Sequence, residues 1–199
     1  METQKNCHVG PIHISAALDT LKRNGFVVGE KLSFQFDEPL GNIKAIGDYL
    51  LGNLEVTESV QKVAEYLKDT QGKHLCLLGG VGTGKTLLAT KILPILFQMQ
   101  YNKFFTSIKA VNLAEELRVA KRNNFVIIDD VGTESDAMEF GNKISQFSEW
   151  IDTLENRSSM SIITTNLSAD QIKQRYGMRT YDRIRGLFKV ITFNEKSMR

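Results

Sequence analysis

The sequence is poor in the residues that mark disulfide-bonded, metal-bound or strongly charged proteins. Its 199 residues include 2 cysteines, 3 prolines and 1 tryptophan, and the formal net charge is +2. Cys7 and Cys76 give neither a disulfide framework nor a metal-ligand spacing. Cys76 lies in an apolar stretch, which suits a small core residue in a reducing compartment. The balanced charge gives no global nucleic-acid footprint, so any basic surface must be local.

Long apolar runs are also absent. No run approaches the roughly 20 residues that a membrane-spanning helix requires, and the first residues lack the apolar centre of a signal peptide. We therefore expect a cytoplasmic protein with no membrane partner. The length allows one α/β domain with a real core and a small appendage.

The most informative feature that is present is a glycine-rich stretch at residues 79–86. It fits the phosphate-binding pattern of Gly, four residues, Gly, Lys and Ser or Thr. The apolar run at 74–78 predicts a buried strand before it, and the apolar periodicity of 87–92 predicts a helix after it. The alternative is a glycine-rich turn that binds nothing. We disfavour it because so many glycines weaken local structure unless the backbone must approach something closely.

The chemistry of a nucleotide explains the residue types of this loop. Backbone N–H groups and the start of a helix attract the phosphates. Lys85 is predicted to reach the β- and γ-phosphates, and the hydroxyl of Thr86 is predicted to hold Mg²⁺. The predicted phosphate-binding residues are Gly79, Gly80, Val81, Gly82, Thr83, Gly84, Lys85 and Thr86.

A second apolar run, residues 125–128, ends in Asp129 and Asp130. It suits a strand buried on both faces whose carboxylates lie at the carboxyl edge of the sheet, where α/β proteins bind ligands. We predict that Asp129 belongs to the Mg²⁺ shell and that Asp130 orients or deprotonates the attacking water. The alternative is that the two acids and Gly132 simply form a turn.

A third buried strand, residues 160–165, delivers Asn166 to the same edge. Its amide can hydrogen-bond water or the γ-phosphate as donor and acceptor, unless it is only a turn residue. Ser168 and Gln171 then match a capping box that opens a helix, and Gly177 is predicted to close it.

The other helices and strands are predicted from apolar periodicity and from helix-breaking residues. A helix begins at Thr57, the helix after the phosphate loop is predicted to kink or end before Pro94, and residues 187–193 form a last strand. Residues 138–156 are predicted to form one long amphipathic helix. Its apolar stripe would consist of Phe140, Ile144, Phe147, Ile151 and Leu154.

The N-terminal residues 12–36 resemble a small unit with a helix capped by Ser15 and strands at 26–28 and 32–36. The alternating apolar side chains of the second strand predict a packed face, with a base-stacking platform as the alternative. We therefore divide the chain into a short N-terminal region, residues 1–52, which is a candidate partner- or DNA-binding region, and a nucleotide domain, residues 53–199.

Together, the phosphate loop, the Asp-Asp strand, the strand end at Asn166 and an arginine-rich helix before the last strand resemble the AAA+ ATPases of the DnaC/DnaI helicase-loader and IstB group. The resemblance covers residues 53–199. It implies an α/β P-loop NTPase fold of the AAA+ (ASCE) type, with a three-layer α/β/α arrangement around a parallel sheet. A short N-terminal α+β extension would precede this domain, and no helical lid would follow it.

The resemblance also assigns roles to individual residues. Residues 79–86 would be Walker A and residues 127–130 Walker B, and Asn166 would be sensor 1. Arg183, with Arg179 as its neighbour, would be the arginine finger, and Arg199 would be sensor 2.

By resemblance, the chain binds ATP and Mg²⁺, hydrolyses ATP, and assembles as an ATP-dependent homo-oligomer on single-stranded DNA with a replicative helicase. Two departures matter. Asp130 replaces the Glu of many AAA+ proteins, which predicts slow or partner-stimulated hydrolysis, and residues 1–52 are shorter than a typical helicase-binding domain. The alternatives are an IstB-like helper of a transposase on duplex DNA, a small-molecule P-loop kinase, and a binding module that holds ATP without turnover.

Overall fold

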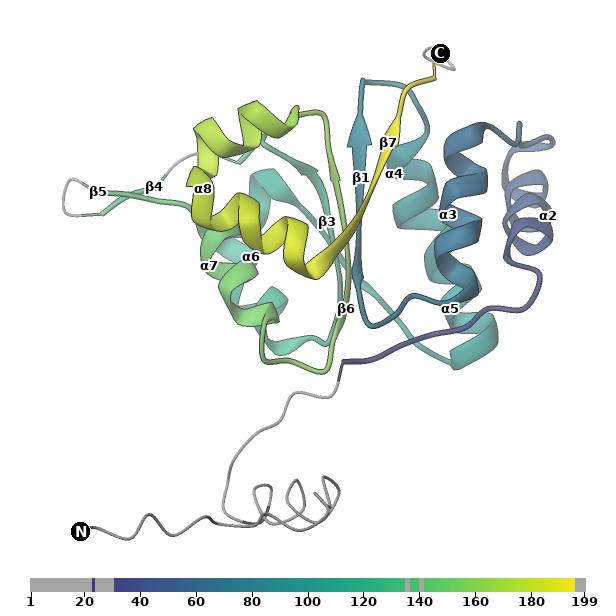
Figure 1. Cartoon of the computed structure of the whole chain (residues 1–199), viewed down its shortest axis with the longest axis horizontal. Helices are drawn as coiled ribbons and strands as arrows, with labels where there is room; N and C mark the ends of the chain where they lie inside the picture. The colour runs from purple at the N-terminus through teal and green to yellow at the C-terminus, as the bar shows by residue number, and fades with distance from the viewer. Residues whose placement is uncertain (1–22, 24–30, 135–136, 140–141, 196–199) are drawn as a thin grey trace, which may run out of the picture.

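The computed structural model describes residue 23 and residues 31–134, 137–139 and 142–195 (Figure 1). Its centre is a five-stranded sheet in the order β2-β3-β6-β1-β7, in which all paired strands are parallel. The strands are β1 (His74–Gly79), β2 (Thr106–Lys109), β3 (Phe125–Val131), β6 (Met160–Thr165) and β7 (Phe188–Phe193). Because the strands are parallel, all their carboxyl ends meet at one edge.

Helices cover both faces of this sheet (Figure 1). One face carries α3 (Glu58–Lys68) and the helical segments α4 (Lys85–Leu87) and α5 (Leu93–Tyr101), with α2 (Pro39–Leu51) outside them. The other carries α6 (Leu113–Arg122), α7 (Gln146–Leu154) and α8 (Ala169–Leu187). Each face has its own hydrophobic cluster. The predicted three-layer α/β/α fold is confirmed. No helix in the described part of the chain is long and apolar enough to cross a membrane.

The segment before α2 differs from the prediction. Residues 31–36 form no strand. Two of their backbone N–H groups bond to helical neighbours instead: Phe36 donates to the Leu67 carbonyl of α3 at 3.0 Å, and Gln35 donates to the Tyr101 hydroxyl of α5 at 2.9 Å. Phe34 and Phe36 are buried and pack edge-on against Phe97, so they form a packed face and not a base-stacking platform. The predicted helix at Ser15 and the strand at 26–28 lie outside the described residues.

The division of the chain at residue 53 stays a prediction. Ile43 and Ile46 of α2, together with Phe34 and Phe36, belong to the same hydrophobic cluster as the helices of the nucleotide domain.

The single helix predicted at residues 138–156 is wrong in its first half. Strands β4 (Ala137–Glu139) and β5 (Asn142–Ile144) pair antiparallel and project from the body (Figure 1). Helix α7 starts only after Ser145, whose hydroxyl accepts the Ser148 N–H at 3.3 Å as an N-cap. The apolar stripe is therefore limited to Phe147, Ile151 and Leu154, which are buried.

Of two predicted helix breaks, the one at Pro94 takes another form and the one at Gly177 is present. The chain stays helical through Pro94 because a π-helical turn, Leu88–Ile92, precedes α5, so the missing proline N–H does not end the helix. Gly177 interrupts α8 as predicted. It adopts the non-helical values φ 81° and ψ 164°, so the helical segment that begins after Ser168 ends there and a second segment follows the kink. The predicted capping box of Ser168 and Gln171 is confirmed.

Burial of His74 makes stability depend on pH. The ring is 5% exposed, and its Nδ1 accepts the Ser161 N–H at 3.1 Å. Burial, helped by the charges of Lys31 and Lys73, lowers the pKa of His74 to about 4. Between that value and about 6.5, the unfolded chain binds more protons than the folded one, so stability falls as the pH drops.

We expect His74 to contribute a loss of about 3 kcal/mol in unfolding free energy between pH 7 and pH 4. The variant His74→Asn keeps an acceptor for Ser161 but does not titrate. Urea unfolding across this range should show a steeper decline for the wild type than for the variant. Parallel curves would contradict the assignment.

Candidate nucleotide site

A cavity of about 580 Å³ opens at the carboxyl edge of the sheet. The phosphate loop, the end of β3 and the residue after β6 all contribute to its wall. Lining residues are Val81, Gly82, Thr83, Gly84, Lys85, Thr86, Leu87, Thr90, Lys91, Asp130 and Asn166. The structure thus brings Lys85, Asp130 and Asn166, far apart in the sequence, to one cavity.

The loop fits tightly against its surroundings. A Cβ atom on Gly79 would lie 2.3 Å from the Phe193 carbonyl oxygen at the end of β7, so the close approach of these strands requires glycine. Within the loop, the Lys85 ammonium donates to the Gly80 carbonyl at 2.6 Å and to the Thr83 hydroxyl at 3.2 Å. Gly80 was predicted to contact phosphate but does not line the cavity; its carbonyl instead accepts these donors from Lys85 and Thr83.

Lys85 is a cation held in a confined place. Its side chain is largely buried, and this burial lowers the pKa of Lys85 from its ordinary value. The negative charges of Asp130 and Asp129 act in the opposite direction and favour the ammonium form. Within the described residues, the hydrogen-bond partners of the Lys85 ammonium are neutral groups of the loop, and a buried cation can exchange such partners for an anion.

Asp129 joins three elements through one oxygen. Its Oδ1 accepts the Thr86 hydroxyl at 2.9 Å and the Thr164 hydroxyl at 2.6 Å, and the side chain is 5% exposed. Thr86 lies in α4, directly after the loop, and Thr164 belongs to β6, so this carboxylate connects the start of that helix with two central strands. Sequence reasoning missed Thr164, although two hydroxyl residues ending an otherwise apolar strand were a usable signal.

Asp130 points differently from Asp129 because the strand is irregular between them. The pairing of β3 with β6 shifts register between Ile128 and Val131, and Asp130 adopts φ 59°. Such a bulge changes the direction of a side chain. Here it lets Asp129 contact the Thr86 and Thr164 hydroxyls while Asp130 lines the cavity. The Asp130 N–H donates to the Thr164 hydroxyl at 2.8 Å.

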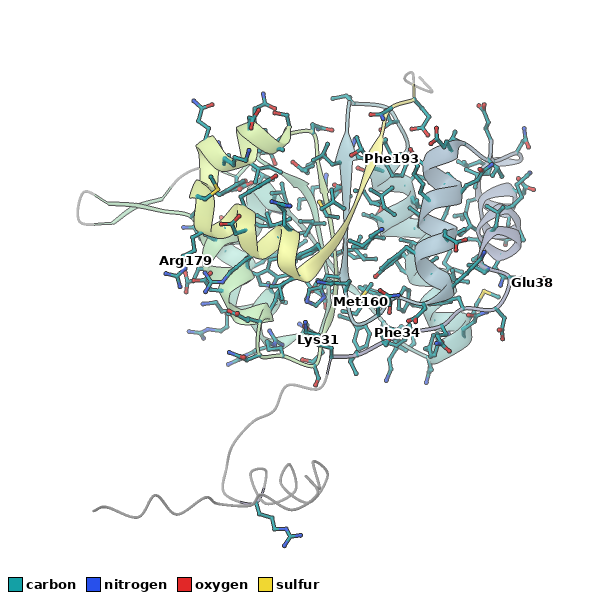
Figure 2. All side chains as sticks on the ribbon, in the orientation of Figure 1. Lys31, Phe34, Glu38, Met160, Arg179 and Phe193 are labelled. Carbon is teal, nitrogen blue, oxygen red and sulfur yellow. The ribbon has the colours of Figure 1, made fainter. Side chains whose placement is uncertain are left out.

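The predicted arginines lie away from this cavity on α8. Arg183 pairs with Asp152 at 2.7 Å and with Glu155 at 3.5 Å, and its side chain is 21% exposed. Arg179 is 77% exposed, 3.4 Å from Asp152, and lies at the outer edge of the molecule (Figure 2). Neither lines the cavity of its own chain. Arg199 lies outside the described residues.

The residues present fit a nucleotide with its magnesium ion. The cavity offers a loop lysine for phosphate, and the Thr86 hydroxyl and the Asp129 carboxylate are hard oxygen ligands already in contact. Within the described residues, no cluster of three or more His, Cys, Asp and Glu side chains could hold a metal alone. Magnesium characteristically binds through one or two carboxylates plus phosphate oxygens, so this set is sufficient.

We expect Thr164→Val to destabilise the fold by about 1–3 kcal/mol, because it leaves the Asp130 N–H without its acceptor and removes one of the two hydroxyl donors to Asp129, the other being Thr86. Ser161→Ala on the same strand is the control, because the Ser161 hydroxyl is buried with no hydrogen-bond partner in the described structure. Urea denaturation compares the two. Equal losses would show that the Thr164 hydroxyl is not important for stability.

Solved structures share this fold. The crystal structure of the DnaC helicase loader is 18% identical, with 73% of this chain and 96% of that chain covered and a TM-score of 0.57. The crystal structure of DnaI is 18% identical, with 72% and 90% covered and a TM-score of 0.56. AMPPCP-bound DnaA from Aquifex aeolicus is 18% identical, with 73% and 50% covered and a TM-score of 0.51. The resemblance to helicase loaders is confirmed at the level of the fold.

No curated protein matches the sequence significantly. Residues 55–192, more than half of the chain, match the novel STAND NTPase 3 family. The chain has the phosphate loop and the parallel sheet of a P-loop NTPase, and it belongs to this family of STAND NTPases.

Proposed function

We propose that the chain binds ATP with Mg²⁺ in the cavity at the carboxyl edge and hydrolyses it to ADP and phosphate. The observation that carries the proposal is the convergence of Lys85, Asp130 and Asn166 on one cavity beside the Thr86–Asp129 pair. A kinase would need a second substrate site, and no feature of the described residues favours one. The DnaA structure that shares the fold is bound to AMPPCP, an ATP analogue, which supports ATP as the nucleotide.

The phosphates would be bound by the loop and by Lys85. The Lys85 ammonium would exchange its contact with the Gly80 carbonyl for the β- and γ-phosphates. Thr86 and Asp129 would hold Mg²⁺, which supplies charge neutralisation at the phosphate oxygens when bound. Thr164, by donating to Asp129, would keep this carboxylate turned toward Thr86.

Asp130 and Asn166 would act on the attacking water. Asp130 lies on the wall of the cavity and carries the acceptor that can orient the water or take its proton. Asn166, directly after the end of the neighbouring strand β6, can donate to the γ-phosphate or to the water. Aspartate reaches one methylene less far than the glutamate of many AAA+ proteins, so we propose slow or partner-stimulated hydrolysis.

An arginine of α8 would complete the site of a neighbouring copy in an ATP-dependent homo-oligomer. For Arg183 this requires release from Asp152 and Glu155, whereas Arg179 is exposed and needs little rearrangement. Both arginines are therefore candidates for the trans-acting finger. Arg199 stays a candidate sensor 2 residue.

In the cell, we propose a cytoplasmic DNA-replication accessory protein that assembles on single-stranded DNA and acts on a replicative helicase. The shared fold with the DnaC helicase loader and DnaI supports this choice. The second candidate is an IstB-like helper of a transposase. Affinity purification from cells distinguishes the two by whether helicase or transposase is recovered.

Asp130→Asn should lower the steady-state ATPase rate at least about 100-fold, because an amide cannot accept the proton of the water. The affinity for a fluorescent ATP analogue should change less than about 2-fold, since the phosphate-binding loop is untouched. Phosphate release and fluorescence titration measure the two quantities. An unchanged ATPase rate would remove Asp130 from catalysis.

Sedimentation velocity with Mg²⁺ and a non-hydrolysable ATP analogue, with and without single-stranded DNA, tests assembly. We expect nucleotide-dependent oligomers that Arg183→Ala or Arg179→Ala abolishes, whichever supplies the finger. Arg185→Ala on the same helix is the control for loss of one positive charge, because Arg185 instead packs over the Tyr181 ring. A monomer under every condition would exclude a site shared between copies.

A further inference from the structure

Glu134 is a buried acid for which the proposed reaction has no role. It is 5% exposed and follows β3 by three residues. Its Oε2 accepts the Gly132 N–H at 2.8 Å, and its Oε1 accepts the Tyr176 hydroxyl. Arg175 adds an ion pair at 3.9 Å and donates to the Glu134 backbone carbonyl. A buried carboxylate with so many partners fixes the backbone that carries it.

Glu134 belongs to the turn formed by residues 130–134, which begins with Asp130. The Asp130 carbonyl accepts the Thr133 N–H at 3.2 Å and the Thr133 hydroxyl at 2.8 Å, while Glu134 binds back to Gly132. Asp130 itself adopts φ 59°, a conformation that costs free energy in a residue with a side chain. The direction of the Asp130 carboxylate therefore depends on the contacts that hold this turn.

The turn also contacts the strand end that carries Asn166. Gly132 adopts φ 109°, and a Cβ atom there would lie 2.8 Å from the side chain of Leu167. The turn and the residue after Asn166 thus pack without room for a methyl group. A shift of the turn would therefore displace both Asp130 and the strand end that carries Asn166.

The partners of Glu134 belong to α8, the helix that also carries the candidate finger arginines. Arg175 and Tyr176 lie directly before the kink at Gly177, and Arg179 and Arg183 lie beyond it, paired with α7. The first part of α8 is therefore held by these contacts against the turn that follows β3. Burial and the hydrogen bond to Glu134 raise the pKa of the Tyr176 hydroxyl, which keeps it a donor.

We propose that Glu134 is a positioning residue, held by Tyr176 and Arg175 of α8, that fixes the turn 130–134 and thereby the Asp130 carboxylate in the cavity. The proposal rests on the proposed ATP hydrolysis and adds a residue to it. Through the same contacts, the position of α8 is coupled to the geometry of the hydrolytic acid.

The kinetic test uses Glu134→Gln. Gly132 and Tyr176 donate to different oxygens of Glu134, and glutamine replaces one of these oxygens with an NH₂ group that cannot accept, so one of the two contacts is lost. We expect the ATPase rate at saturating ATP to fall about 10-fold, within the range that a misplacement of about 1 Å can cause. Affinity for a fluorescent ATP analogue should stay within about 2-fold. Glu149→Gln, which alters an exposed ion pair with Lys121, is the matched control and should leave both values unchanged.

The double variant Asp130→Asn with Glu134→Gln separates positioning from general destabilisation. If Glu134 acts through Asp130, the double variant hydrolyses ATP at the rate of Asp130→Asn alone. Independent losses that multiply, or an unchanged rate in Glu134→Gln, would overturn the proposal.

Amide hydrogen exchange does not require ATP hydrolysis, so it tests the role of Glu134 in the turn independently of the proposed ATPase function. Amide hydrogen exchange at Gly132 should be faster in Tyr176→Phe than in the wild type, because Glu134 loses a partner. Unchanged exchange would overturn the role of α8. Faster exchange in a protein whose wild type does not hydrolyse ATP would refute the hydrolysis and leave the anchored turn established.

Discussion

The buried carboxylate of Asp129 is the interaction on which the site depends. A carboxylate removed from water is costly unless donors surround it, and here Thr86 and Thr164 supply them from two other elements. The start of the helix after the loop, the end of β3 and the end of β6 are thereby fixed relative to one another. The arrangement of the residues around the cavity follows from these contacts.

The bulge in β3 separates the tasks of two adjacent acids. In a regular strand, Asp129 and Asp130 would point to opposite faces of the sheet. The register shift and the left-handed backbone at Asp130 instead place its side chain on the cavity wall while Asp129 stays buried. The left-handed conformation at Asp130 costs free energy, and Glu134 ties the turn that follows Asp130 to α8. The turn 130–134 therefore links the position of α8 to the position of the Asp130 carboxylate in the cavity.

Two kinds of feature could be predicted from the sequence: those encoded by a contiguous motif and those that follow from the geometry of parallel sheets. The phosphate loop is a contiguous pattern, and Asp129, Asp130 and Asn166 could be placed because parallel strands end at the same edge. Strands β4 and β5 were missed because the apolar residues in that part of the sequence continue a helical spacing that also fits α7. Pro94 was read as a break, since nothing local indicates that a π-helical turn will accommodate it. Glu134 could not be found, because its partner Tyr176 is 42 residues away and no short motif joins them.

Calorimetric titration of the protein with ATP in the presence and absence of Mg²⁺, for the wild type and Lys85→Ala, tests the central claim most directly. The account predicts one ATP per chain, with binding that is tighter with Mg²⁺ and at least about 10-fold weaker in Lys85→Ala, since that side chain is the buried cation of the cavity. Absence of saturable binding, or equal affinity with and without Mg²⁺ and Lys85, would contradict the assignment of this cavity as a Mg²⁺–ATP site.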